Sequence, residues 1–270
     1  MAGLVERVTE RDAPRSRNTL DEEEEEEARI ALQAKPLEVP KLTVHADKTL
    51  PQGADVGIVS VGPELSSFVE ACFVEGSAEE VGTLEVGPHR AVVRSISSGK
   101  VSWVALESIE GIEERALWSW AKATIEALGS PSHVCVVDAM FTYEFLSEGG
   151  RHEEPPLVRG LASSAKARAS CISLGVDVLE SGNLVTGLTA AILGECTFAA
   201  PANGCLAFLS LRESQLGAET LLALVGPLLG LLEPISASLD STFLRDVETV
   251  RSACGVIRER RAADRGLLYM

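Results

Sequence analysis

The feature that most constrains this fold is a set of short β-forming strings, most of them apolar over four or more consecutive residues. They are ADVGIVSVG (54–62), HRAVVRSI (89–96), VSWVALE (101–107), HVCVVDA (133–139), ASCISLGVDVL (169–179) and GCLAFLSL (204–211). A strand that is covered on one face alternates apolar and polar residues, whereas a strand that is covered on both faces is apolar throughout. The strings therefore predict strands of one sheet with helices on both sides.

Helical patterns lie between these strings. In the segment 107–129, one apolar stripe ends at Gly129, with Pro131 just beyond; its members are Ile109, Ile112, Ala116, Trp120, Ala123 and Leu128. Three more helices are predicted at 181–195, at 218–232 with a kink at Pro227, and at about 240–263. The last one has the stripe Phe243, Val247, Val250, Cys254 and Ile257. The alternation predicts an α/β fold, a three-layer sandwich around a mostly parallel central sheet.

Composition divides the chain into three parts. Residues 1–50 are charged and free of aromatic residues, and they include the acidic run Asp21–Glu27, so they are predicted to be a disordered acidic arm. Residues 51–263 are predicted to form one α/β domain, within which the charged, Gly- and Pro-rich segment 145–160 is a mobile loop. Residues 264–270 are predicted to be a flexible carboxyl-terminal tail.

Net charge and cysteine content limit the function classes. The formal charge of -16 argues against a nucleic-acid partner, because phosphates require a basic face. The six cysteines form no CxxC pair and mostly sit in apolar strings, so they are predicted to be buried and reduced. The amino terminus has no apolar stretch for a signal peptide. These features predict an intracellular protein, cytoplasmic with the nucleus also open.

No membrane span is predicted. The longest segments of low charge are interrupted by Gly and Pro, as in LLALVGPLLGLL (221–232). They fall short of the roughly 20 apolar residues that a helix needs to cross a bilayer. The sequence therefore predicts no membrane partner.

The glycine-rich and serine-containing motifs offer weak active-site candidates. GNLVTGLT (182–189) has the glycine spacing of a phosphate loop, but Leu188 stands where such a loop carries its lysine. A tight strand-to-helix turn is the favoured interpretation, although its backbone amides are able to hold an anion. GIVSVG (57–62) is not a nucleophile elbow, because Ser60 lies one residue too far from Gly57.

Ionisable residues nominate no catalytic or metal site. The four histidines form no HExxH pattern, and no His/Cys pair has the spacing of a metal site, so no metal and no cofactor are expected. Asp177, just before the turn that begins at Glu180, is the best single acid for an enzyme. An ordinary turn carboxylate is the more common meaning of such a residue.

The chain ends in Leu268, Tyr269 and Met270, and Tyr269 is one of two tyrosines in the sequence. Such an ending presents an aliphatic side chain, an aromatic ring with a hydroxyl, and a terminal carboxylate. It suits a pocket with an apolar wall and a lysine at its floor. A lone tail binds weakly, so useful affinity requires a second contact surface or a second tail.

This ending resembles the hydrophobic-tyrosine-X motif with which proteasomal activators and assembly chaperones dock between α-subunits of the 20S proteasome. The body resembles the proteasome assembly chaperone 1 family. The similar segments are LSSFVEACFVEGSAEEVG (65–82), EPPLVRGLASS (154–164) and ESGNLVTGLTAAILGECTFAAPANGCLAFLSL (180–211). The similarity spans roughly residues 55–230 together with the last three.

The resemblance implies an α/β fold without enzymatic activity. It also implies a heterodimer with proteasome assembly chaperone 2 that caps the nascent α-ring of the 20S proteasome, with Leu268, Tyr269 and Met270 as the docking residues. One alternative stays open at this point. It is an α/β enzyme of phosphorylase or hydrolase type, with Asp177 and the 181–187 turn facing a small anionic substrate.

Overall fold

The computed structural model describes residues 38–108, 111–147, 157–198, 204–212, 216–238 and 243–268, with side chains of the last segment described to Ile257. The strands are β1 (Lys41–Val44), β2 (Val56–Val61), β3 (Ala78–Val86), β4 (His89–Ile96), β5 (Val101–Ser108), β6 (His133–Phe141), β7 (Val158–Ala162), β8 (Asp177–Val178) and β9 (Gly204–Arg212). The helices are α2 (Pro63–Ala71), α3 (Leu117–Ala127), α4 (Ala165–Ser173), α5 (Gly187–Phe198), α6 (Ala218–Ser238) and α7 (Val247–Leu268).

The described strands form one nine-stranded sheet in the order β1-β3-β4-β5-β2-β6-β9-β7-β8. Its centre, β5-β2-β6-β9, is parallel, with Ile58 of β2 beside Trp103 of β5 and Cys135 of β6. The β1-β3-β4-β5 side and the β9-β7 pair are antiparallel, and β7 and β8 are parallel. Parallel strands therefore occupy the middle of a mixed sheet.

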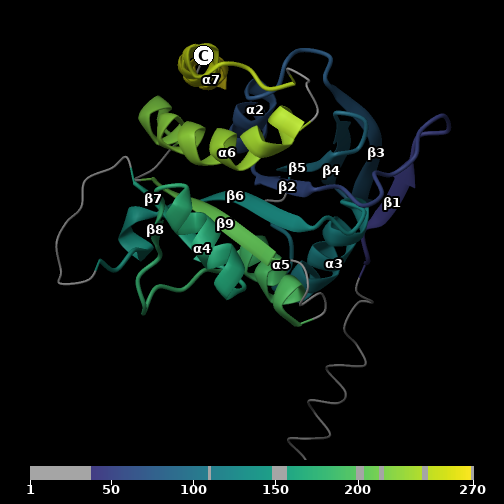
Figure 1. Ribbon diagram of the computed structural model, residues 1–270, viewed down its shortest axis with the longest axis horizontal. Coiled ribbons are helices and arrows are strands. Elements are labelled where there is room, and N and C mark those ends of the chain that lie inside the picture. Colours follow the sequence, from purple (N-terminus) through teal and green to yellow (C-terminus); the bar gives the residue numbers. More distant parts are fainter. Residues whose placement is uncertain are drawn as a thin grey trace, which may run out of the picture. The chain divides into compact units, whose positions relative to one another are not determined.

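Helices cover both faces of the sheet (Figure 1). One face carries α2, α4 and α6, with α7 packed on α2 and α6. The other face carries α3 and α5, which pack against each other. The predicted three-layer α/β sandwich is confirmed.

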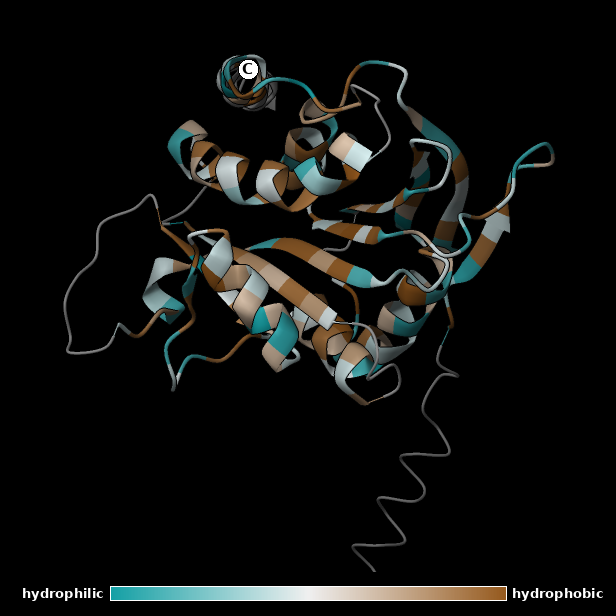
Figure 2. Ribbon diagram, in the orientation of Figure 1, coloured by the Kyte–Doolittle hydropathy of each residue, from teal (hydrophilic) through white to brown (hydrophobic). Residues whose placement is uncertain are grey.

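The central strands consist mostly of apolar residues (Figure 2), as predicted for strands that are covered on both faces. In β2 every residue from Val56 to Ser60 is buried, and in β9 every residue from Gly204 to Leu211 is buried. Helix α3 ends two residues before Gly129, whose φ is +74°. A Cβ at this glycine would lie 1.7 Å from the carbonyl oxygen of Pro51, so the predicted stop signal is confirmed for a physical reason.

The strand predicted at 169–179 is wrong. Its first half belongs to α4, whose amino end is capped by the Ser164 hydroxyl, which accepts a hydrogen bond from the amide of Ala167 at 3.2 Å. Helix α4 ends before Gly175, which has a positive φ, and only Asp177–Val178 forms a strand. The buried residues Ala167 and Cys171 are four apart, which is helical spacing, but the helix is too short for this period to stand out.

Other boundaries also differ from the predictions. Strand β3 was not predicted, because its three glutamates obscure a strand that is exposed on part of one face. Strand β7 lies at the end of the predicted 145–160 loop, of which residues 148–156 are outside the described part. Helix α3 begins at Leu117, so Ile112 precedes it. Helix α5 begins at Gly187, because residues 181–183 form a turn of their own.

The predicted disordered arm is too long at its carboxyl side. Lys41–Val44 pair with Gly82–Glu85 of β3 as an edge strand, and the amide of His45 donates to the carbonyl of Val81 at 3.0 Å. Backbone pairing explains this order, since an edge strand requires few buried side chains of its own. Residues 1–37, which include Asp21–Glu27, lie outside the described residues.

Helix α6 is longer than the sequence patterns suggested. It contains Pro227 and Pro234. With 21 residues, it is the one helix among those described that is long and apolar enough to cross a membrane, judged by length and composition only. That apolarity has a structural use here. The helix buries one side in the core through residues that include Leu221, Leu224, Val225, Leu228 and Leu232.

Candidate functional site

The predicted docking residues follow α7, and the start of this helix is fixed to the body of the domain. The amide of Val74 donates to the carbonyl of Phe243 at 2.9 Å, and the amide of Arg245 donates to the carbonyl of Cys72 at 2.9 Å. The ring of Phe243 stacks on Phe73, with 6.3 Å between centroids. The segment before α7 is therefore paired with the end of α2.

Asp246 caps the amino end of α7. Its carboxylate accepts hydrogen bonds from the amide of Thr249 at 2.9 Å and from the Thr249 hydroxyl at 2.5 Å. The Thr249 hydroxyl bond is the main cause that lowers the pKa of Asp246, so the charged form is present at the positive end of the helix dipole. Val250 and Cys254, one turn apart, are fully buried in the core against α2 and α6.

The helix continues to Leu268, beyond the predicted helix end at residue 263. Residues 264–268, which were predicted as part of the tail, thus have helical backbone. Tyr269 and Met270 lie outside the described residues, so docking through Leu268, Tyr269 and Met270 stays a prediction. What the structure adds is an anchored helix that leads to these residues.

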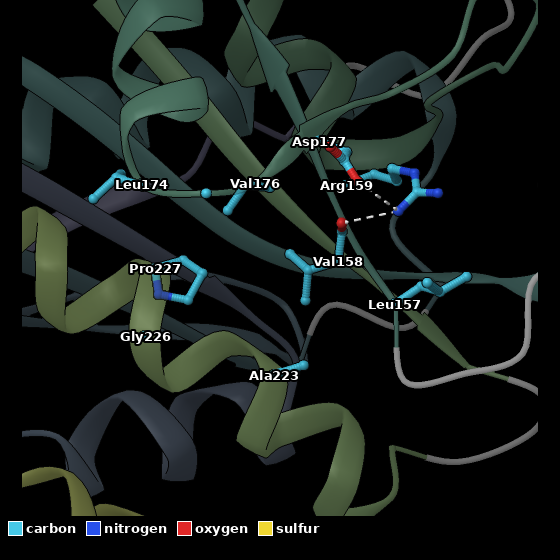
Figure 3. Close-up of a pocket in the computed structure, with 10 residues that line it drawn as sticks. Leu157, Val158, Arg159, Leu174, Val176, Asp177, Ala223, Gly226 and Pro227 are labelled. Carbon is cyan, nitrogen blue, oxygen red and sulfur yellow. Dashed lines mark hydrogen bonds and ion pairs between the residues drawn. The ribbon is translucent and has the colours of Figure 1, made fainter.

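The enzymatic alternative centred on Asp177, which lines a pocket of about 440 Å³ (Figure 3). The pocket lies between β7, the α4–β8 connection and α6, so its other side is formed by residues such as Ala223 and Pro227. Asp177 itself is on the short edge strand β8, and its side chain is 87% exposed. Apart from Asp177 and Arg159, the residues that line the pocket have apolar side chains or are glycines.

The charges near this pocket are already paired. Arg159 is buried on β7, and its Nε donates to the Glu180 carboxylate at 3.1 and 3.3 Å. Arg159 Nη1 lies 4.0 Å from Asp177 Oδ2 and 3.4 Å from the carbonyl oxygen of Val158. One guanidinium faces two carboxylates, so an anionic substrate meets no excess of positive charge.

The 181–187 turn is a structural connection. The side-chain amide of Asn183 accepts from the amide of Leu146 at 2.6 Å and donates to the carbonyls of Leu146 at 2.9 Å and Glu180 at 3.0 Å. Leu188, where a phosphate loop carries its lysine, is buried in the core. The structure therefore agrees with the strand-to-helix turn and gives the phosphate-binding interpretation no support.

Ser60 is also occupied by structural contacts. It is fully buried, its hydroxyl is 3.0 Å from that of Ser66, and it accepts a hydrogen bond from Nε1 of Trp103 at 2.9 Å. The six cysteines are all buried and unpaired by disulfides, as predicted. Among the described residues, no group of three or more His, Cys, Asp or Glu side chains is arranged to hold a metal ion.

Asp138 of β6 is an ionisable residue of interest that the sequence motifs did not nominate. Its carboxylate accepts from the Thr189 hydroxyl of α5 at 2.5 Å and from the amide of Ala139 at 2.7 Å. Burial is the main cause that raises the pKa of Asp138, and the two hydrogen bonds act against it. An acidic residue inside the apolar string HVCVVDA was the sequence feature from which Asp138 could have been singled out. Its hydrogen bond with Thr189 shows that Asp138 links β6 to α5.

Comparisons with known proteins address the fold. No family model matches the sequence, and neither does any curated protein. PbaA of Pyrococcus furiosus, an archaeal homolog of proteasome-assembly chaperone, matches with a TM-score of 0.58 and 15% identity over 86% of this chain and 94% of its own. The chain has the fold of this archaeal protein. PbaB of the same organism, an archaeal proteasome activator, matches with a TM-score of 0.59 and 9% identity over 84% of this chain and 99% of its own.

Proposed function

We propose that this protein is a noncatalytic assembly chaperone of the 20S proteasome. In this proposal it pairs with proteasome assembly chaperone 2 and binds the α-ring in the cytoplasm, with the nucleus as a second location. The observation that carries the proposal is the fold shared with PbaA and PbaB, combined with a Leu-Tyr-Met ending whose leucine is the last residue of an anchored helix. The resemblance to the proteasome assembly chaperone 1 family agrees with both.

The proposed docking contact is weak by itself. Burial of the Leu268 and Tyr269 side chains contributes about 2 kcal/mol each. A charge-assisted bond to the terminal carboxylate contributes about 1.5–3 kcal/mol. Ordering each flexible residue costs about 1–2 kcal/mol, so the net free energy of binding is small.

The anchored base of α7 raises the effective concentration of this ending near a surface that the body already contacts. Pairing of residues 243–245 with the end of α2 and burial of Val250 and Cys254 fix where α7 leaves the domain. A second contact, made by the body or by a partner chaperone, then makes docking of the tail an intramolecular event. This arrangement favours a binding role for the ending over a frayed terminus.

Blocking the terminal carboxylate tests the proposal. One glycine appended after Met270 leaves every side chain in place but moves the carboxylate. We expect recovery of α-subunits to fall by at least tenfold when the tagged chaperone is purified from cells and its bound proteins are counted by mass spectrometry. Equal recovery with and without the added glycine would contradict docking through the terminus.

A further inference from the structure

Two of the six buried cysteines face each other between α5 and β9. Helix α5 packs on β9 (Figure 1), and both elements contribute to the core on the same face of the sheet. Cys196 is one helical turn beyond the buried Ile192, so it lies on the side of α5 that faces the sheet. Cys205 shares one face of β9 with Ala207 and Leu209, because alternate residues of a strand point to the same side. The two side chains therefore meet in the core.

The thiols of Cys196 and Cys205 form a hydrogen bond with each other. Cys196 is 1% exposed and Cys205 is 0% exposed, so water does not compete for this contact. In a disulfide the two sulfur atoms are about 2.05 Å apart, so bond formation requires a small further approach of the two side chains. A disulfide at this place would join the last turn of α5 to the start of β9 across one short connection.

The hydrogen bond makes the two thiols unequal. It is the main cause that lowers the pKa of Cys196 and the main cause that raises the pKa of Cys205. Burial and the Glu195 carboxylate act against the lowered pKa of Cys196, but the hydrogen bond prevails. The Cys205 thiol thus donates to the Cys196 sulfur and stabilises its ionised form. The thiolate is the form of a cysteine that reacts with oxidants.

Access also distinguishes the two cysteines. Cys196 is in the last turn of α5, two residues before Phe198, which is 81% exposed. The end of a helix opens at a low cost in free energy, so Cys196 meets solvent in brief local openings. The backbone of Cys205 is held by Ser163, whose amide donates to the Cys205 carbonyl at 2.9 Å and whose hydroxyl accepts from the Cys205 amide at 2.9 Å. A small oxidant therefore reaches Cys196 first.

We infer that Cys196 and Cys205 form a redox-active dithiol, in which a hydroperoxide oxidises Cys196 and Cys205 then closes a disulfide. In the first step the Cys196 thiolate attacks one oxygen of hydrogen peroxide, the O–O bond breaks, and hydroxide leaves as sulfenic acid forms. The hydroxide takes up the proton that Cys196 lost. In the second step the Cys205 sulfur attacks the Cys196 sulfur, and the hydroxyl group leaves with the Cys205 proton as water.

The two steps balance as one two-electron oxidation. The two thiols lose two electrons and two protons, and one peroxide is reduced to two molecules of water. Exchange with a thiol reductant restores the dithiol, so the modification is reversible. In reducing compartments, disulfides of this transient kind are usually catalytic or redox-sensing.

The other four cysteines provide a control inside the same chain. Cys72 and Cys254 are close enough for their charges to influence each other, and so are Cys135 and Cys171. All four are buried, and burial is the main cause that raises the pKa of each thiol. Burial and proximity are therefore common to all three pairs. Among the six cysteines, a lowered pKa is specific to Cys196.

Oxidation of the full chain tests the inference directly. The reduced chain is exposed to hydrogen peroxide below its unfolding temperature, the remaining thiols are alkylated, and the unreduced digest is analysed by mass spectrometry. We expect a disulfide between Cys196 and Cys205, with the other four cysteines recovered as alkylated thiols. Absence of this disulfide overturns the inference. Equal oxidation of all three pairs also overturns it, because the hydrogen-bonded pair would then have no special reactivity.

Single variants separate the roles of the two cysteines. Cys205→Ala blocks the second step, so we expect the sulfenic acid at Cys196, trapped with dimedone, to rise about tenfold over the unchanged chain. In Cys196→Ala we expect Cys205 to stay reduced, because no thiolate starts the reaction. The matched control is Cys171→Ala, since Cys171 is 0% exposed on α4 at the opposite face of the sheet. It should leave the disulfide between Cys196 and Cys205 unchanged.

Thermal unfolding shows whether the variants are folded. If Cys205→Ala unfolds at a lower temperature than the unchanged chain, Cys205→Val replaces it, because the larger valine side chain leaves no cavity. A folded Cys205 variant without sulfenic acid at Cys196 overturns the order of the two steps. The experiment needs no partner chain, so its result is independent of the proposed chaperone function.

Discussion

Arg159 shows how one buried charge is tolerated in an apolar domain. Its side chain is 5% exposed and that of its partner Glu180 is 15% exposed, so both groups have lost most of their water. Removing one member of such a pair takes away the main charge that compensates the other. The ring of Phe145, 5.3 Å from the guanidinium, covers Arg159 on a further side.

We therefore predict that Glu180→Ala lowers the free energy of unfolding by about 3 kcal/mol. The control is Asp177→Ala, because the Asp177 side chain is 87% exposed and 4.0 Å from Arg159. Exposed pairs of this kind contribute less than about 1 kcal/mol. Urea unfolding followed by tryptophan fluorescence measures both, and equal destabilisation by the two variants would contradict the assignment of Glu180 as the main partner.

Asp138 predicts a pH dependence of stability. Burial raises the pKa of its carboxyl above the ordinary value of 3.8, so the folded protein holds this proton more tightly than the unfolded chain does. The tighter proton binding by Asp138 in the folded state contributes to the free energy of unfolding. This contribution is fully present below pH 3.8 and is lost as the pH rises through the folded-state pKa of Asp138. Asp138→Asn cannot ionise and can still accept from Thr189.

We thus expect Asp138→Asn to have the higher free energy of unfolding at pH 7, with the difference shrinking as the pH falls towards 3.8. Unfolding curves at several pH values measure this. Asp246 provides the opposite case, since hydrogen bonds from Thr249 lower its pKa and its stabilisation is lost as the pH falls. A difference at position 138 that grows with acidity would refute the explanation by burial.

Tyr269 has an internal control, because the only other tyrosine is Tyr143. Tyr143 is 74% exposed and stacks on Phe141, with 5.0 Å between ring centroids. We predict that Tyr269→Ala weakens binding to proteasome precursors by about 1–3 kcal/mol, as expected for an aromatic anchor that leaves its pocket. Tyr143→Ala should leave binding unchanged in the same pull-down, and similar losses for both would point to a general effect of losing an aromatic ring.

At the scale of elements, α7 depends on the segment before it. Phe243 is 4% exposed, stacks on Phe73 and adjoins the hydrogen bonds that join residues 243–245 to the end of α2. Truncating a buried phenylalanine to alanine typically costs about 3–5 kcal/mol. We expect the loss of free energy at position 243 to weaken mainly the packing of α7 on the domain.

We predict that Phe243→Ala destabilises the domain by about 3 kcal/mol and increases hydrogen exchange across Val247–Ile257. Val247→Ala is the matched control, because Val247 is 40% exposed at the start of the same helix. Hydrogen exchange measured by mass spectrometry distinguishes changes in α7 from changes in the strands of the sheet. Uniform exchange changes throughout the sheet would instead mean that Phe243 supports the core as a whole.

Sequence patterns predicted the elements that have strong local signals. The central strands β2, β6 and β9 were predictable because each is a long apolar run that is covered on both faces. Helix α4 and strand β3 were not, since α4 is nine residues long and β3 contains three glutamates. The Arg159–Glu180 pair joins residues 21 positions apart, and no local pattern reports such a contact.

At the scale of the whole molecule, exposed apolar side chains affect the behaviour of the purified chain. Leu184 and Phe198 are each 81% exposed, and exposed apolar surface promotes association. We predict that the chain alone self-associates and that co-expression with proteasome assembly chaperone 2 gives a defined heterodimer. Light scattering during size-exclusion chromatography measures both, and a stable monomer of the isolated chain would contradict the prediction.

The order of strands in the sheet has a consequence for synthesis on the ribosome. Strand β6 pairs with β2 on one edge and with β9 on the other, from His133 beside Gly204 to Phe141 beside Arg212. Because β9 is translated long after β6, the apolar edge at Val134–Val137 emerges without its second neighbour. A nascent chain that stalls before Gly204 therefore exposes an unpaired apolar strand edge. Intermediates of this kind are prone to aggregate and need protection by general chaperones of the cell.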